Sequence, residues 1–123
     1  MYNMSLVEER YETLTSLFEK YQRNLAGVSA EDREGKYKNA FTKLRQEILY
    51  AVADYAFAYT CCVYIPEGST LTASAVSLVK KFLPSIMNVL WVDGLEKAEE
   101  EVEVLRNEFL TNYYFPAMRQ AVA

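Results

Sequence analysis

The sequence predicts an all-α protein, most simply an antiparallel four-helix bundle with a long second helix and a proline-kinked third helix. Apolar residues recur at alternating steps of three and four, whereas no segment alternates with period two. The chain has only four glycines and three prolines, and most of them separate the periodic segments. The connections are short, which favours antiparallel neighbours. We expect one domain, residues 1–123, with helices at about 5–26, 30–64, 70–92 and 94–114 and a short carboxyl-terminal tail.

The first predicted helix begins at Ser5. Ser5 and Glu8 have the spacing of a capping box, in which the two side chains satisfy each other's free backbone amides. The apolar residues that follow share one face of the helix: Val7, Tyr11, Leu14, Phe18, Tyr21 and Leu25. Gly27 is expected to end this helix.

The second predicted helix begins at Ser29, and Gly35 weakens its charged first half. Its expected core face carries Tyr37, Phe41, Leu44, Ile48, Val52, Tyr55, Tyr59 and Cys62. Residues 48–65 carry one charge, Asp54, and are barely long enough to span a membrane. Because an aspartate near the bilayer centre costs about 3 kcal/mol, we expect no membrane span here.

The third predicted helix follows Ser69 or Thr70 and is apolar over about half of its circumference. We therefore expect it to be the most buried helix. Pro84 lies inside it and should kink it, because proline removes one hydrogen bond of the helix.

The fourth predicted helix starts at Asp93, with Glu96 three residues further on as its capping partner. The apolar face changes phase at Asp93, so we expect the chain to turn back there; one long bent helix is the alternative. Pro116 should end or kink the last segment and leave residues 115–123 as a tail.

Composition argues against most catalytic chemistry. The chain has no histidine, which excludes Ser–His and Cys–His nucleophile pairs and removes the commonest metal ligand. Cys61 and Cys62 are adjacent and cannot hold zinc or staple a fold; Cys62 falls on the core face and Cys61 does not. Ser77 and Lys80 match a serine–lysine spacing found in some acyl-enzymes, but we interpret them as part of a polar helix face. We expect no enzyme, no cofactor and no metal site.

Charge is unevenly distributed along the chain. The net charge is −4, and residues 93–123 hold seven acids against three bases. The glutamates after residue 95 are interpreted as a solvated face. The amino-terminal residues lead directly into a charged stretch, so we expect no signal peptide and a cytoplasmic protein.

An aromatic stripe is the most informative feature. Tyr50, Phe57 and Tyr64 recur every seven residues, on a face roughly opposite the predicted core face, and Asp54 borders them. A helix that is apolar on two faces is buried on both sides, and tyrosine is common at interfaces. We therefore predict that Tyr50, Asp54, Phe57 and Tyr64 form a protein interface; burial within the monomer and a membrane or ligand role are the alternatives.

The leading hypothesis is a small non-catalytic helical interaction protein, an accessory subunit, adaptor or inhibitor that binds a protein partner or forms a homo-oligomer. An alternative is an accessory subunit of a nucleic-acid-associated complex, which the acidic pI does not favour. Its phosphate contacts would be Lys36, Lys38 and Lys43, in a basic cluster that also contains Arg33 and Arg45. A further alternative is a carrier of an apolar ligand between the second and third helices, where alanines leave space.

Overall fold

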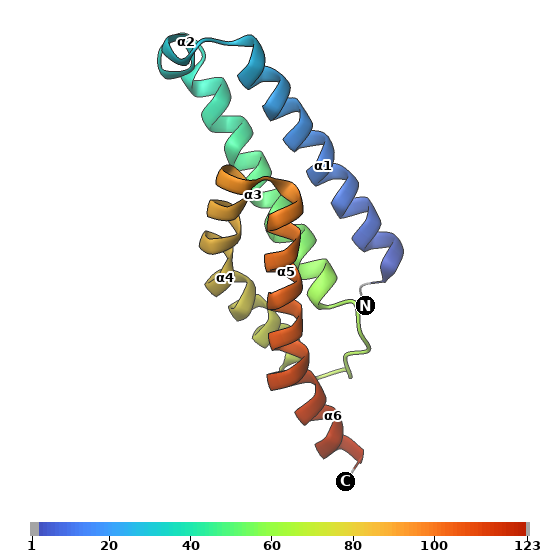
Figure 1. Cartoon of the computed structure of the whole chain (residues 1–123). Helices are drawn as coiled ribbons and strands as arrows, with labels where there is room; N and C mark the ends of the chain where they lie inside the picture. Colours follow the sequence, from blue (N-terminus) through green and yellow to red (C-terminus); the bar gives the residue numbers. More distant parts are fainter. Residues whose placement is uncertain (1–2, 123) are drawn as a thin grey trace.

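The computed structural model describes residues 3–122 and is all-helical (Figure 1). Helices account for 86% of it, and the described residues contain no strand. The predicted all-α class is therefore confirmed.

The first helix, α1 (Met4–Gly27), begins one residue earlier than predicted. Its N-cap is Asn3, whose side-chain oxygen accepts a hydrogen bond from the Leu6 amide at 3.0 Å. The predicted capping box of Ser5 and Glu8 is wrong, because Ser5 lies inside the helix. Asparagine is as good an N-cap as serine, so the earlier of two competing caps sets the start.

The predicted second helix is divided into α2 (Ala30–Glu34) and α3 (Lys38–Thr60). Ser29 caps α2 as predicted, accepting a hydrogen bond from the Asp32 amide at 3.2 Å. One continuous helix over 30–64 is wrong, because Gly35 has non-helical dihedrals (φ −117°, ψ −95°). Glycine loses more backbone freedom in a helix than any other residue, and it breaks this one.

The end of α3 comes four residues before the predicted end. Residues 61–70 form a connection without regular helix, and Pro66 lies within it. The residue before a proline is disfavoured in helical conformation, so the helix stops upstream. Cys62 and Tyr64, which were predicted to lie on faces of this helix, therefore belong to the connection that follows it.

Helices α4 (Leu71–Asp93) and α5 (Leu95–Phe109) are separate, as expected, and meet at Gly94. Gly94 has φ +99° and ψ 177°, a conformation open essentially only to glycine. It also takes the N-cap position of α5, so the predicted cap at Asp93 is wrong. The helix α4 continues through Pro84, and the kink expected there stays a prediction.

The carboxyl-terminal tail is helical, contrary to prediction. A π-helical segment, η1 (Leu110–Tyr114), leads from α5 into α6 (Phe115–Val122). Pro116 is the second residue of α6 and lies inside a continuous helical run, because η1 leads into α6 without a break. A proline ring clashes with the carbonyl four residues earlier, which is that of Asn112 in η1. The wider π turn spans this position, so the chain remains helical across the proline.

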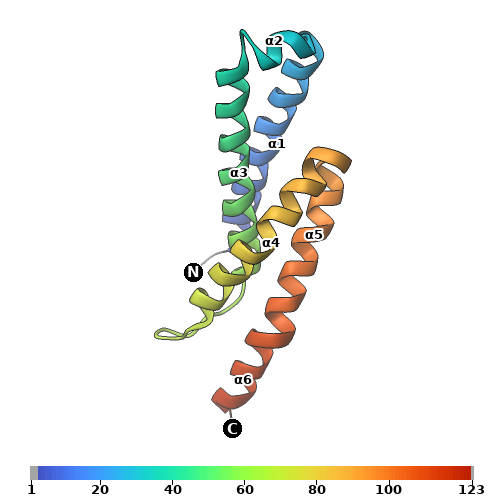
Figure 2. The same ribbon diagram turned by 90° about the vertical axis from the view of Figure 1, so that its left-hand side faces the viewer.

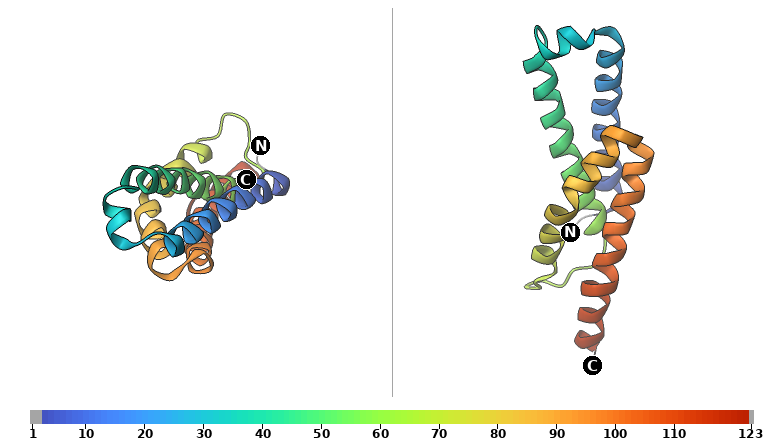
Figure 3. Two further views of the ribbon diagram at one scale, coloured as in Figure 1. Left: turned by 90° about the horizontal axis from the view of Figure 1, so that it is seen from above. Right: turned by 60° about the vertical axis from the view of Figure 1, so that its left-hand side comes forward.

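The four long helices form two helical hairpins, α1 with α3 and α4 with α5 (Figures 1 and 3). One core cluster contains buried residues from all four, and its fully buried side chains include Ile48, Ile86, Leu105 and Phe109. The two hairpins are staggered: the α2 end of the first extends past the turn between α4 and α5, and α6 extends beyond the opposite end (Figure 2).

Candidate functional site

The outer face of α3 carries three of the predicted interface residues, Tyr50, Asp54 and Phe57. We define it by six residues at alternating steps of three and four: Ala40, Lys43, Glu47, Tyr50, Asp54 and Phe57. All of them are exposed except Phe57, which is half-buried against the core. Along the upper part of α3 in Figure 2, no other helix lies on its left side.

The inner face of the same helix explains why this face points outward. Ile48, Val52 and Tyr55 are buried, and they lie roughly a third of a turn around the helix from the outer face at 100° per residue. The inner face carries no charge, whereas Lys43, Glu47 and Asp54 all lie on the outer one. Burying the outer face inside the monomer would strand these charges, so the apolar face turns inward.

Three of the four predicted interface residues are brought together on one face, and the fourth is not. Tyr50 is 65% exposed and Asp54 is exposed, with Phe57 one turn beyond. Tyr64 is 61% exposed but follows the end of α3, in the connection to α4. Its placement on the stripe is wrong, because the stripe was extrapolated along a helix that ends at Thr60. Burial of Tyr50 and Tyr64 within the monomer is also contradicted.

The charges on the outer face have no ionic partner within the described chain. Within residues 3–122 the structure contains one ion pair, between exposed Lys97 and Glu100 at 3.4 Å. Lys43 and Glu47 are one turn apart on α3 and still form no pair within 4.0 Å. The face therefore presents a lysine, a glutamate, a tyrosine hydroxyl and an aspartate in that order to whatever approaches it.

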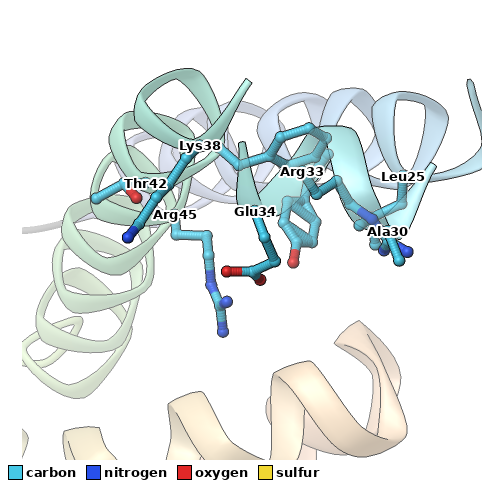
Figure 4. A pocket seen from close by; sticks show the side chains of 9 residues that line it. Leu25, Ala30, Arg33, Glu34, Lys38, Thr42 and Arg45 are labelled. Atoms are coloured by element: carbon cyan, nitrogen blue, oxygen red, sulfur yellow. The ribbon is translucent and has the colours of Figure 1, made fainter. Parts of the chain in front are cut away.

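The basic cluster is only partly gathered. Lys38 lines an open hollow of about 410 Å³ between α1, α2 and α3, together with Arg33, Arg45 and one carboxylate, Glu34 (Figure 4). The remaining walls come from Tyr21, Leu25, Ala30, Phe41 and Thr42. Concave sites of this volume suit a small ligand, and the three cations make an anion the chemically matched one.

Two of the three predicted phosphate contacts lie outside this hollow. Lys36 is not among its lining residues, and its ammonium lies 5.2 Å from the centre of the Tyr37 ring. Lys43 belongs to the outer face of α3 instead. The arginine that lines the hollow from α3, Arg45, also stacks its guanidinium on the Trp91 ring at 4.7 Å.

A tyrosine ladder, which was not predicted from the sequence, joins α1, α3 and α5. The Tyr11 and Tyr55 rings lie 5.4 Å apart, and Tyr55 stacks on Tyr59 at 6.0 Å. The Tyr59 hydroxyl donates a hydrogen bond to the Glu103 carboxylate. Arg106 donates from Nε to the Tyr59 carbonyl at 3.1 Å and lies 4.9 Å from the Tyr59 ring centre. Arg106 thus adds a second hydrogen bond to a carbonyl in the last turn of α3, which also accepts from the Cys62 amide at 3.3 Å.

The ladder keeps its phenols protonated. Burial, then the nearby Glu99 carboxylate, raises the pKa of Tyr55 well above its ordinary value. Burial and Glu99 raise the pKa of Tyr11 in the same direction. For Tyr59 the hydrogen bond to Glu103 is the largest cause of a raised pKa, followed by burial. A protonated phenol can donate a hydrogen bond to a carboxylate, as Tyr59 does to Glu103. The ladder therefore connects the α1–α3 hairpin to the α4–α5 hairpin.

The sequence contains a signal for this ladder that can be stated in retrospect. Tyr55 and Tyr59 are one helical turn apart, as are Glu99 and Glu103. Two such pairs on facing helices can meet, but only a register between α3 and α5 makes them do so.

The two cysteines are placed opposite to the prediction. Cys61 is buried, at 1% exposed, and Cys62 is half-buried. Because α3 ends at Thr60, the helical face assigned to Cys62 does not exist. Burial raises the pKa of the Cys61 thiol to about 11, which suppresses the thiolate at neutral pH.

Other groups of chemical interest are few in the described part of the chain. Ser77 and Lys80 are both exposed on α4. Among residues 3–122 no group of three or more cysteines and carboxylates is placed to hold a metal ion. Six alanines were proposed to leave space for a ligand. Ala51, Ala56, Ala58 and Ala75 are buried members of the packed core, whereas Ala53 is half-buried and Ala73 is exposed.

The helix α4 is long and apolar enough to cross a membrane by length and composition alone. Core helices of soluble proteins meet the same criterion, so this property does not distinguish a span from a core element. The apolar segment 48–65 lies instead in α3 and in the connection after it.

Comparison with known proteins returned no relative: no family model, no curated protein and no solved structure matches the chain. Two surfaces of the molecule are candidate sites: the outer face of α3 and the cationic hollow beside α2.

Proposed function

We propose that this chain is a small non-catalytic helical interaction protein that forms a homo-oligomer through the outer face of α3. In this proposal it serves as an accessory subunit, adaptor or inhibitor in the cytoplasm, and oligomer formation builds the surface that acts. The proposal takes its two hairpins as one antiparallel four-helix bundle with α4 kinked at Pro84.

One observation carries the proposal: Tyr50 is 65% exposed at the middle of a long helix. A buried tyrosine covers roughly 150–250 Å² and is enriched in interfaces, because its ring is apolar and its hydroxyl can still form a hydrogen bond. Phe57 adds aromatic surface one heptad further along the same face. Charged side chains flank both aromatic residues, as at the rim of an interface.

Light scattering after size exclusion tests self-association. The perturbation is Tyr50→Glu, and the matched control is Tyr64→Glu, which changes an almost equally exposed tyrosine (61%) outside the helix. We expect an assembly of at least two copies for the unmodified chain and for Tyr64→Glu, and a monomer for Tyr50→Glu. A monomeric unmodified chain would refute self-association, and equal loss in both variants would refute the assignment to α3.

The cationic hollow favours a second candidate, an accessory subunit of a nucleic-acid-associated complex. Arg33, Lys38 and Arg45 line it, and none of them forms an ion pair within the described residues. Phosphate contacts of this kind make binding salt-sensitive. Lys38→Gln should weaken binding to a single-stranded RNA oligonucleotide at low salt, whereas Lys36→Gln, outside the hollow, should have less effect. Binding that both variants retain would exclude the hollow.

A further inference from the structure

The outer face of α3 is self-complementary in charge. Its six positions follow the repeat of a coiled-coil seam, with Ala40, Glu47 and Asp54 one heptad apart and Lys43, Tyr50 and Phe57 forming the second set. In an antiparallel pair of identical helices, the residue numbers of every two facing residues add up to the same sum. When this sum is 97, each layer pairs one residue from each set. Ala40 then faces Phe57, Lys43 faces Asp54, and Glu47 faces Tyr50.

We infer that the partner on this face is a second copy of the chain, packed antiparallel through α3 about a two-fold axis between residues 48 and 49. This inference rests on the proposed function and names its partner and register. Lys43 of each copy then faces Asp54 of the other, and the Tyr50 hydroxyl faces the Glu47 carboxylate of the other. Phe57 covers the small Ala40 side chain of the second copy. Each contact occurs twice, as two-fold symmetry requires.

The charges exclude the parallel arrangement. In a parallel pair each residue meets its own copy, which would place Lys43 on Lys43, Glu47 on Glu47 and Asp54 on Asp54. Three layers of like charges would then face each other, and such layers suppress a pairing. The antiparallel register replaces two of these repulsions by Lys43–Asp54 pairs and gives Glu47 a hydroxyl donor.

A shift by one heptad is the nearest competing register. It pairs Lys43 with Glu47 of the second copy and Ala40 with Tyr50. This register fills four of the six positions. It leaves Asp54 opposite Lys36, in the turn between α2 and α3, and Phe57 opposite Arg33 of α2, so both lie beyond the start of the second copy's α3. The register centred between residues 48 and 49 uses all six and covers both aromatic side chains, so burial favours it.

Lys43 and Asp54 cannot satisfy each other within one chain. Eleven residues separate them on α3, which places them about 16 Å apart along the helix at 1.5 Å per residue. Any coupling between substitutions at these two positions is therefore a contact between copies. This separation makes a charge exchange the sharpest test of the register.

Sedimentation velocity on the full chain measures the dimer dissociation constant for the unmodified chain, Lys43→Glu, Asp54→Lys and the double variant. Each single change turns two attractive pairs into two repulsive ones, and we expect about tenfold weaker association, equivalent to about 1.4 kcal/mol. The double variant restores both pairs with reversed sign and should return to within about threefold of the unmodified chain. Far-UV circular dichroism confirms that each variant remains helical.

The matched control is Lys97→Glu, which changes an exposed lysine of α5 outside the outer face of α3. It has the same charge change as Lys43→Glu and should leave the dissociation constant unchanged. Equal weakening by the two variants would make the effect one of net charge and overturn the inference.

Two other results separate the register from the proposed function. A dimer that Tyr50→Glu dissociates, but that the double variant Lys43→Glu/Asp54→Lys fails to restore, overturns the register and leaves the α3 interface standing. Restoration by Lys43→Glu/Glu47→Lys alone would assign the shifted register instead. A monomeric unmodified chain overturns the proposed function and the register together.

Discussion

Replacing Tyr55 with phenylalanine should make the free energy of unfolding of this protein fall less steeply as the pH rises above 10. Tyr55 is 8% exposed and lies between the Tyr11 and Tyr59 rings. Burial, with Glu99 as the next cause, raises the pKa of its phenol above the ordinary value of 10.0. Phenylalanine keeps the buried ring and removes the proton that titrates.

The sign of the effect follows from proton counting. In the unfolded chain the phenol ionises near pH 10, whereas in the folded chain it keeps its proton to higher pH. Its contribution to stability is therefore fully present below pH 10 and is lost as the pH rises above it. One proton difference between the two states gives a slope of about 1.4 kcal/mol per pH unit, so the loss attributable to Tyr55 is about 1.4 kcal/mol at pH 11.

Urea unfolding monitored by circular dichroism between about pH 8 and pH 11 measures this slope for the unmodified chain and for Tyr55→Phe. Tyr11 and Tyr59 also have raised pKa values, so part of the alkaline slope remains in the variant. The matched control is Tyr64→Phe, which removes a phenol that folding leaves 61% exposed. Parallel pH profiles for the unmodified chain and Tyr55→Phe would refute the assignment of the loss to Tyr55.

Two further predictions concern single positions. Cys62 should react with a thiol reagent before Cys61, because Cys61 is buried and its pKa is raised to about 11. Intact mass spectrometry of the variants Cys61→Ser and Cys62→Ser measures the rate of the remaining cysteine in each. Equal rates would contradict the burial of Cys61. Gly94→Ala should lower the free energy of unfolding by about 1–3 kcal/mol, because φ at Gly94 is +99°. The control Gly27→Ala lies in helix α1 with open space around it and should be neutral or stabilising. Similar effects of the two substitutions in urea unfolding would refute backbone strain at Gly94.

Helical class and most of the buried residues follow from the sequence, because burial of one face gives a period that is visible along the chain. Helix ends follow less well, since they depend on local competition. Asn3 competes with Ser5 for the cap of α1, and Gly35 divides a helix whose apolar pattern continues across it. The helical tail after Pro116 was not predicted, because the π turn that lets the helix continue past this proline produces no apolar periodicity in the sequence.

The candidate interface was predictable only as far as its helix extends. Tyr50, Asp54 and Phe57 share a face because α3 is helical throughout that stretch. Tyr64 and Cys62 were misplaced for one reason, the end of the helix at Thr60. The bond between Tyr59 and Glu103 joins residues 44 positions apart, and helical periodicity contains no information about the register between two helices.

The charges on α3 have two effects that depend on the same side chains. A helix with aromatic residues on two faces can pack either face inward, and Lys43, Glu47 and Asp54 remove that ambiguity, because turning them into the monomer core would bury unpaired charges. If those charges only kept this face in solvent, any order of positive and negative charges along the helix would have the same effect. The order here gives opposite charges in the antiparallel register and like charges in the parallel one. The variant Lys43→Glu/Glu47→Lys keeps the net charge but places like charges at positions 43 and 54 of the antiparallel register. It should therefore preserve the monomer fold and weaken the proposed dimer about tenfold, which circular dichroism and sedimentation velocity can measure separately.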